Sequence, residues 1–265
     1  MGKVVELDDP SVPRFASWRS YSLFAFNVRT ARRYVWTREI DAFLQTLLAT
    51  TVKRLDKIPH GARFYRAQKG WASSNERGHH YPYGPDRMKP QERRASEGRA
   101  NSVGIPVLYL ATSPETAVSE TRPWVGAQVS VGTFEVTRDL TIVNFTHEGP
   151  TGAFRKLGLD GIFGERKPST EQITDAVLAD IDDAFSRPVS REDSSAADYA
   201  PTQILTELFK DAGYDGIAYN SHFKGGHNVA LFDVEAARLR VCAPYEVKEV
   251  QIAIKQVDAE LYYEN

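Results

Sequence analysis

The chain has 265 residues, of which 42% are hydrophobic and 26% charged, and its formal net charge is −2. This composition supplies a sizeable apolar core and excludes a disordered or fibrous chain. The near-neutral charge provides no overall field that favours nucleic acid or an anionic membrane, so direct binding to nucleic acid is not expected.

The cysteine content and the N-terminus indicate a cellular compartment. Cys242 is the single cysteine of the sequence, which excludes an intramolecular disulfide and a cysteine-based zinc site. The first ten residues, "MGKVVELDDP", contain acids and no apolar segment, unlike a secretory signal. No stretch approaches the roughly 18 uninterrupted apolar residues of a membrane span. We therefore expect a soluble, cytoplasmic protein without membrane contact.

The first clear element in chain order is a helix over residues 38–56. Its apolar residues recur at helical spacing, and "IPHG" ends it. We expect residues 1–60 to form a helical N-terminal extension packed on the core. The remaining chain, 61–265, is then the main domain.

The next predicted elements are two short strands, a long loop between them and one helix. "RFYRAQ" (63–68) and "VLYLA" (107–111) have the composition of strands, and the Gly-, Pro- and charge-rich stretch between them predicts a long loop over 70–98. Loops of this length inside compact domains are usually functional or mobile. A helix over about 114–121 follows.

The second half of the chain contains more strands than helices. "AQVSVGTFEV" and "LTIVNF" predict strands, and an amphipathic helix lies within 150–200. A helix over 200–212 ends before Gly213, a suitable C-cap residue. "GIAYN" and "NVALFD" predict further strands. Runs of strands with few helices indicate an α+β fold rather than a doubly wound sheet.

Glu120 occupies an unusual position in its predicted helix. Ser113 and Pro114 suit the start of the helix, and Pro123 ends it, so Glu120 falls in the last turn. The helix dipole opposes a carboxylate there by about 0.3–1 kcal/mol. From spacing alone, the simpler interpretation is a solvent-exposed glutamate paired loosely with Arg122. The alternative is a functional carboxylate.

Two arginines are candidates for binding phosphate. Arg66 lies in a strand between aromatic and apolar residues, and Arg99 lies between Gly98 and Gly104. Arginine forks onto phosphate oxygens in partly dry sites, and glycines let a backbone approach a ligand. The segment around Arg99 is neither a Walker loop nor a Rossmann fingerprint. Spacing alone leaves both arginines open to interpretation as surface cations.

Other polar motifs indicate no specific chemistry alone. The pair His79–His80 has no third ligand at a recognised spacing, so no metal site is expected. Ser221 follows a strand but lacks the G-x-S-x-G pattern of a hydrolase nucleophile, and it reads as a turn residue.

The four blocks "FYRAQ", "GRANSVGIPVLYLATSPETAVSE", "GYDGIAYNS" and "GGHNVALF" occur in this order between about residues 60 and 235. Together they resemble the RES domain family, which is named for an arginine, a glutamate and a serine. The order of the blocks is much more specific than any block by itself.

The resemblance implies site residues. Matched position by position, the three naming residues are Arg66, Glu120 and Ser221, and all three are expected to be catalytic. Arg99 of "GRAN" and Tyr109 of "LYLA" are expected to bind the substrate.

The resemblance also implies a fold, an activity and a partner. The expected fold is an ADP-ribosyltransferase-like split, mixed β-sandwich with flanking helices that clasps NAD⁺. Many members are toxins that deplete NAD⁺ by cleaving its nicotinamide–ribose bond, some by phosphorolysis, and an Xre-like helix-turn-helix antitoxin blocks their active site. NAD⁺ is then a substrate, inorganic phosphate a possible co-substrate, and no resident cofactor is expected.

This chain departs from compact members of the family by its length. The additional residues lie in the N-terminal extension and in predicted insertions at about 70–98 and 150–198. These segments leave undetermined which molecule accepts the ADP-ribose group. An NAD⁺ phosphorylase or glycohydrolase, an ADP-ribosyltransferase acting on a protein or nucleic acid, and a non-catalytic binding module are the three alternatives.

Overall fold

The computed structural model describes residues 13–74, 78–91, 95–146, 167–187, 196–223 and 225–252, with isolated positions between 153 and 164 and between 254 and 258. Its main helices are α1 (Ser20–Thr30), α2 (Arg38–Thr51), α3 (Pro85–Met88), α4 (Pro114–Glu120), α6 (Thr170–Ser186) and α7 (Ala196–Asp211). Its strands are β1 (Leu55–Ile58), β2 (Arg63–Lys69), β3 (Ser73–Ser74), β4 (His80–Tyr81), β5 (Leu108–Ala111), β6 (Gln128–Val136), β7 (Leu140–Asn144), β8 (Gly216–Asn220), β9 (His227–Leu231) and β10 (Ala237–Glu246). Short 3₁₀ turns, η1 (Val52–Arg54) and η2 (Val234–Ala236), precede β1 and β10.

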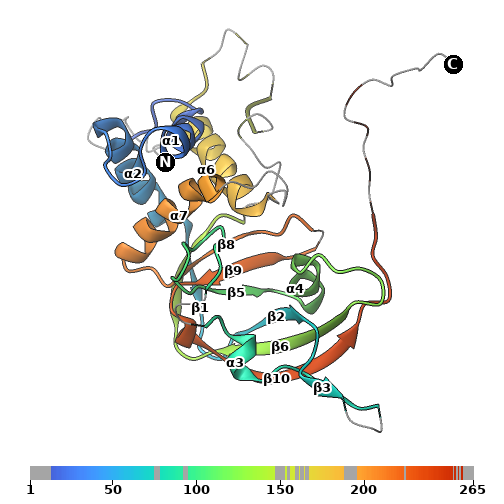
Figure 1. Cartoon of the computed structure of the whole chain (residues 1–265). Coiled ribbons are helices and arrows are strands. Elements are labelled where there is room, and N and C mark those ends of the chain that lie inside the picture. The colour runs from blue at the N-terminus through green and yellow to red at the C-terminus, as the bar shows by residue number, and fades with distance from the viewer. Residues whose placement is uncertain are drawn as a thin grey trace, which may run out of the picture.

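One mixed sheet organises the molecule (Figure 1). Its eight strands follow the order β1-β7-β8-β9-β5-β2-β6-β10, and the neighbours β7 and β8 are parallel while the other pairs are antiparallel. Strands β3 and β4 form a separate two-stranded sheet. The α+β class predicted from the sequence is confirmed.

The large sheet consists of two wings that are joined weakly. The five-stranded wing comprises β1, β7, β8, β9 and β5, and the three-stranded wing comprises β2, β6 and β10. Between β5 and β2 the register contains one pair, Tyr65↔Ala111. Both wings contribute to one apolar cluster, for example Leu110 and Val229 from the first wing and Phe134 from the second. The wings therefore pack face to face as a bent sandwich.

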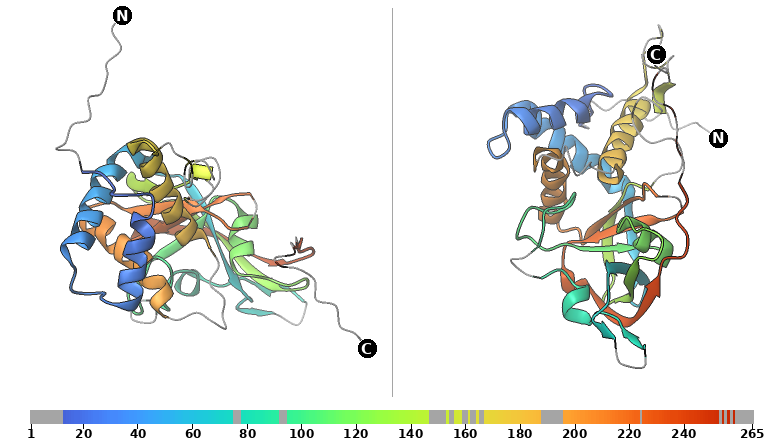
Figure 2. Two further views of the ribbon diagram at one scale, coloured as in Figure 1. Left: turned by 90° about the horizontal axis from the view of Figure 1, so that it is seen from above. Right: turned by 45° about the vertical axis from the view of Figure 1, so that its right-hand side comes forward.

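A layer of helices covers the other face of the five-stranded wing (Figures 1 and 2). Helices α1, α2, α6 and α7 share a second apolar cluster with that wing. Its members include Leu47 from α2, Phe185 from α6 and Phe209 from α7, together with Val143 and Ile217 from the sheet, and all five are fully buried. No helix of the described residues is long and apolar enough to cross a membrane.

The sheet topology explains why α6 and α7 lie between β7 and β8 in the chain. Parallel strands cannot be joined by a tight hairpin and need a long crossover connection, usually helical. Since β7 and β8 are parallel, the chain between them must cross one face of the sheet. The region 150–198, predicted as an insertion, thus supplies part of an obligatory connection, including α6.

The N-terminal region contains more than helices. The predicted helix over 38–56 is too long: α2 ends at Thr51, and Leu55–Ile58 forms β1, which pairs with β7. Pairing with β7 outweighs the helical periodicity at this boundary. Helix α1 contains most of the aromatic-rich stretch "WRSYSLFAF" (18–26). The boundary at residue 60 therefore follows a strand that belongs to the large sheet.

The predicted loop over 70–98 also contains regular structure. Its described residues include β3, β4 and α3, with Met88 completely buried. The expectation of a long irregular loop is therefore wrong in part. Residues 75–77 and 92–94 lie outside the described residues.

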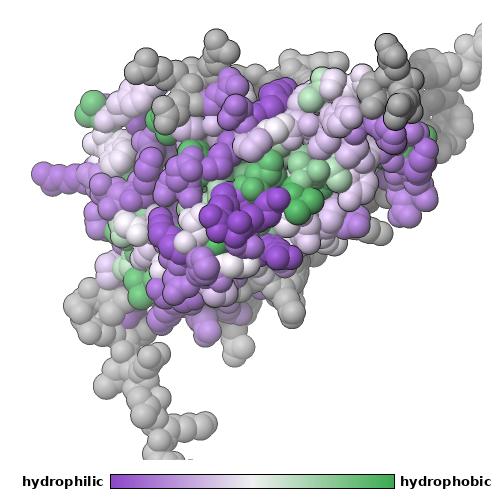
Figure 3. Space-filling model, turned by 90° about the horizontal axis from the view of Figure 1, so that it is seen from below, coloured by the Kyte–Doolittle hydropathy of each residue, from purple (hydrophilic) through white to green (hydrophobic). Residues whose placement is uncertain are grey.

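Strand β10 is the free edge of the three-stranded wing. Its register against β6 shifts between Leu239 and Val241. Arg240, which lies at this shift, donates a hydrogen bond from Nε to Glu135 Oε1 at 3.0 Å. At this end of the molecule, apolar side chains reach the surface among strongly hydrophilic ones (Figure 3).

We predict that Leu47→Ala destabilises the whole protein, because the Leu47 side chain of α2 is fully buried in the apolar cluster shared by the helices and the sheet. The free energy of unfolding should fall by about 2–5 kcal/mol. Urea unfolding followed by circular dichroism measures this change. The exposed Gln45→Ala on the same helix should change it by less than about 0.5 kcal/mol. Equal stability of both variants would show that α2 is not part of the core.

Candidate active site

Helix α4 presents Glu120 at its last turn, as the sequence predicts. Ser113 accepts a hydrogen bond from the backbone N–H of Thr116, and Pro114 begins the helix. The chain leaves the helix through Arg122, whose φ is +49°. A non-glycine residue at positive φ is uncommon, and it turns the chain sharply away from the helix axis.

The Glu120 carboxylate is held by two donors from a different part of the sequence. Ser221 Oγ donates to Glu120 Oε1 at 2.8 Å, and Asn228 Nδ2 donates to the same oxygen at 2.6 Å. Asn228 is only 5% exposed. Within the described part of the chain, Oε2 receives no hydrogen bond, so a ligand can use it. These contacts exclude the interpretation of Glu120 as a loosely paired surface side chain.

The register of the strands explains why these groups meet. Asn228 of β9 pairs with Tyr219 of β8 and with Ala111 of β5, and directly paired residues share one face of a sheet. Tyr109 lies two residues before Ala111 and therefore points to this face too. The face is the one that the helices cover. Tyr109, Tyr219 and Asn228 thus form a polar patch at the end of an otherwise apolar interface.

A tight turn carries Arg99 to the edge of this patch. The Tyr109 hydroxyl accepts from the backbone N–H of Ala100 at 2.9 Å and donates to Asn101 Oδ1 at 2.8 Å. A Cβ atom at Gly98 would stand 2.6 Å from that hydroxyl, so a glycine is required for this approach. The turn that carries Arg99 is therefore built directly on Tyr109.

The turn is also anchored from the helical layer. Gln203 of α7 is 8% exposed and donates to the backbone oxygens of Gly98 at 3.0 Å and Asn101 at 2.9 Å. Helix α7 therefore helps to set the position of Arg99.

Electrostatics link the members of the patch. Burial is the largest cause that raises the pKa of the Tyr219 hydroxyl. Tyr109 and Glu120 raise it further, whereas the Arg99 cation lowers it. Burial likewise raises the pKa of Tyr109, while Arg99 and Arg66 lower it. These groups therefore lie within electrostatic range of one another.

Arg66 lies at the junction of the two wings. Its Nη1 donates to the backbone oxygen of Tyr109 at 3.0 Å. Its Nε is buried without a partner in the described part of the chain, which costs about 1–3 kcal/mol for an unsatisfied polar group. Burial lowers the pKa of Arg66 to about 10, and Arg87 also lowers it. The N–H of Nε is thus an unsatisfied donor inside the junction.

The turn between β8 and β9 positions Ser221. Ser221 N–H donates to the Gly226 oxygen at 3.1 Å, and the Ser221 hydroxyl accepts from Phe223 N–H at 3.2 Å. Thr116 of α4 donates to the Gly225 oxygen at 3.2 Å. A Cβ atom at Gly226 would collide with Thr116. The glycines therefore let this turn lie directly against α4.

The five predicted site residues do not all touch each other. Glu120 and Ser221 are in direct contact, Tyr109 carries the turn of Arg99, and Arg66 reaches Tyr109 through the backbone. Sequence reasoning missed three further residues of the site. These are Gln203, Tyr219 and Asn228. The available signal for Asn228 is a polar residue at the start of the predicted apolar strand "NVALFD".

Neither a group of metal-binding side chains nor the cavity between α3 and β10 coincides with this patch in the described part of the chain. The described residues contain no group of three or more His, Cys, Asp or Glu side chains suited to a metal. His80 instead stacks on Trp71, with ring centroids 3.9 Å apart.

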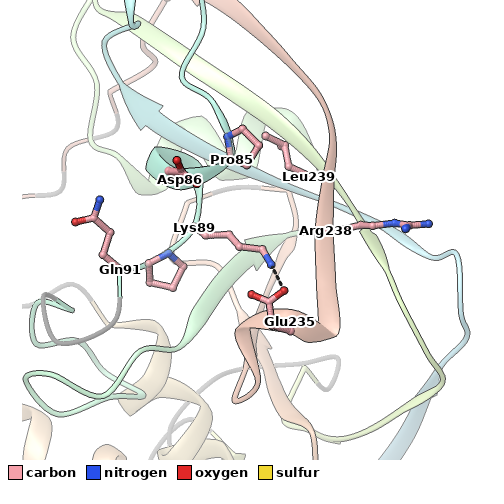
Figure 4. A pocket seen from close by; sticks show the side chains of 8 residues that line it. Pro85, Asp86, Lys89, Gln91, Glu235, Arg238 and Leu239 are labelled. Carbon is pink, nitrogen blue, oxygen red and sulfur yellow. Dashed lines mark hydrogen bonds and ion pairs between the residues drawn. The ribbon is translucent and has the colours of Figure 1, made fainter.

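An open cavity of about 510 Å³ lies between α3 and β10 (Figure 4). Its lining contains Lys89 and Glu235, paired at 2.9 Å, together with Asp86 and Arg238. Charges of both signs balance there, and no predicted site residue lines it.

Comparisons with known proteins identify a family. No protein of curated function matches the chain. A solved structure, the M. tuberculosis MbcT–MbcA toxin–antitoxin complex, contains a similar chain at 16% identity, with coverage of 76% of this chain and 92% of that one. Its TM-score of 0.40 is too low to establish a common fold. The model of the RES domain matches residues 63–252, which is well over half of the sequence. The chain belongs to the RES domain family.

Proposed function

We propose that this protein is a toxin that consumes NAD⁺ by cleaving its nicotinamide–ribose bond through phosphorolysis or hydrolysis, without a resident cofactor. The observation that carries the proposal is the state of Glu120. Its Oε1 is fixed by Ser221 and Asn228, and its Oε2 is left for a ligand. A carboxylate fixed in this way can face a positive charge that develops on a sugar.

The proposed reaction breaks the bond between the ribose carbon C1″ and the nicotinamide nitrogen. The electron pair of that bond goes to the nitrogen, which turns the pyridinium into neutral nicotinamide. The ribose gains oxocarbenium character, which a carboxylate stabilises as in glycoside hydrolysis. An oxygen of phosphate or water then bonds to C1″. Phosphate yields ADP-ribose-1″-phosphate, and water yields ADP-ribose with release of a proton.

Glu120 has two tasks in this reaction. Its charge opposes that of the oxocarbenium ion, and Oε2 can accept a hydrogen bond from a ribose hydroxyl. The Asn228 amide and the Ser221 hydroxyl both donate to Oε1 and keep the carboxylate from rotating. Such preorganisation matters because the site then needs no rearrangement when charge develops.

The arginines supply positive charge for the phosphates. Arg66 is partly exposed as a whole, so its guanidinium can form a charge-assisted bond to a pyrophosphate or phosphate oxygen, and partial burial strengthens such a bond. The Arg99 cation lowers the pKa of Tyr219 and so acts on the same patch. Either arginine can hold the pyrophosphate of NAD⁺ or the incoming phosphate.

Tyr109 and Ser221 orient the other groups. The Tyr109 hydroxyl is used by the turn of Arg99, which leaves its ring for contact with nicotinamide. The Ser221 hydroxyl donates to Glu120 and places this carboxylate beside the ribose. Catalysis then consists mainly of orientation and electrostatics, with no covalent intermediate.

We also propose a protein antitoxin with an Xre-like helix-turn-helix as the partner. Membership of the RES domain family supports this proposal. Such a partner would act by covering the entrance to the Glu120 carboxylate.

Glu120→Gln tests the carboxylate charge. We predict that NAD⁺ consumption falls by about 10²–10³-fold, as when one group that stabilises developing charge is removed. The glutamine keeps the Oε1 acceptor, so thermal unfolding should remain close to that of the wild type. Glu115→Gln, an exposed change at the opposite end of α4, is the matched control and should turn over normally. Normal turnover by Glu120→Gln would remove Glu120 from the mechanism.

Mass spectrometry of NAD⁺ incubated with the purified protein, with and without phosphate, identifies the reaction. We expect nicotinamide release without any macromolecular acceptor. ADP-ribose-1″-phosphate, formed only when phosphate is present, identifies phosphorolysis, and ADP-ribose in both samples identifies hydrolysis. Release that requires added protein or nucleic acid would identify a transferase instead. If the protein neither consumes nor binds NAD⁺, a non-catalytic binding module is left.

A further inference from the structure

Asp182 is a buried carboxylate that the proposed chemistry does not use. It lies on α6 in the crossover connection and is 3% exposed. Burial is the largest cause that raises its pKa, and two hydrogen bonds from Asn220 lower it. Burying a carboxylate is costly, so an apolar residue would pack this helix more favourably. The cost indicates that Asp182 does something other than pack.

All polar groups of Asn220 are bonded, two of them to Asp182. Its backbone N–H donates to Asp182 Oδ1 at 3.0 Å, and its side-chain Nδ2 donates to Asp182 Oδ2 at 2.7 Å. Its backbone oxygen accepts from Ser186 Oγ at 2.6 Å, and its Oδ1 contacts His227 Nδ1 at 3.1 Å. Asn220 is thereby held from α6 on one side and from β9 on the other.

The hydrogen bonds that hold Asn220 also affect the position of the next residue, Ser221. Asn220 ends β8 and pairs with His227 of β9, so it fixes the point from which the turn begins. Ser221 then has to place its hydroxyl 2.8 Å from Glu120. A shift of Asn220 moves Ser221 directly, because the two residues share a peptide bond.

We propose that Asp182 is a positioning residue that acts through Asn220 to hold the Ser221 hydroxyl against Glu120. The inference assigns α6 a function in the site although α6 contributes no group that touches substrate. Its effect on turnover rests on the proposed NAD⁺ reaction, whereas its effect on the geometry of Ser221 does not.

Asp182→Asn is the first test. Asparagine keeps one acceptor for the Asn220 backbone but places an NH₂ group opposite the NH₂ of Asn220, so one of the two bonds is lost. We expect kcat for NAD⁺ to fall by about 10–100-fold, the effect of a small misplacement in an oriented site, while KM changes much less. Asp183→Asn, the neighbour that pairs with Arg187, is the matched control and should retain the kcat of the wild type.

The double variant Asp182→Asn with Asn220→Asp separates positioning from general stability. It reverses the donor and the acceptor, so asparagine at 182 can donate to aspartate at 220 and still accept from the backbone N–H. We expect it to restore most of kcat, whereas Asn220→Asp alone, with two facing carboxylates, should not. If Asp182→Asn does not fold, the double variant decides the question. A folded double variant with low kcat would overturn the proposal.

Hydrogen–deuterium exchange supplies a readout that does not require activity. In Asp182→Asn, the amides of residues 216–223 should exchange faster than in Asp183→Asn, while those of β6 should not change. If the wild type does not consume NAD⁺, the proposed function fails, and this exchange pattern still tests the positioning. Unchanged exchange at 216–223, or an unchanged kcat in an active protein, would refute the function of Asp182.

Discussion

The single registered pair between β2 and β5, Tyr65↔Ala111, is the constraint on which the remaining architecture depends. A sheet with eight fully paired strands would present a continuous ladder at this point. With one pair, the wings can diverge and fold face to face while the strands remain connected. Arg66 follows Tyr65, and α4 begins shortly after Ala111. The junction thus brings a cation and the helix of Glu120 to the same end of the sheet.

The candidate site is assembled from groups that satisfy one another. Glu120 needs donors because it lies at the unfavourable end of its helix, and Asn228 and Ser221 supply them. Its carboxylate in turn gives the buried Asn228 amide an acceptor. The helical layer contributes through Gln203 on the turn of Arg99 and through Asp182 on the end of β8. The helices therefore do more than cover the sheet.

Local periodicity predicted much of this fold, and long-range pairing accounts for the remainder. The apolar spacing in α6 and the capping of α4 were readable because they depend on neighbours along the chain. The end of α2 at Thr51 was missed because β1 is stabilised by a strand far away in sequence. The ordered motifs, and not the spacing, indicate Glu120 as a candidate site residue. Gln203 was not found, since an isolated polar residue on an amphipathic helix gives no indication of its distant partner.

The register shift in β10 has a consequence for the protein outside its own fold. An exposed edge strand offers unpaired N–H and C=O groups, and a further chain can add to it. In β10 the shift between Leu239 and Val241 interrupts the regular spacing of those groups, and Pro244 has no N–H to offer. Arginine side chains along the same strand add charge. The edge is thereby protected from strand addition, which disfavours aggregation even at high protein concentration.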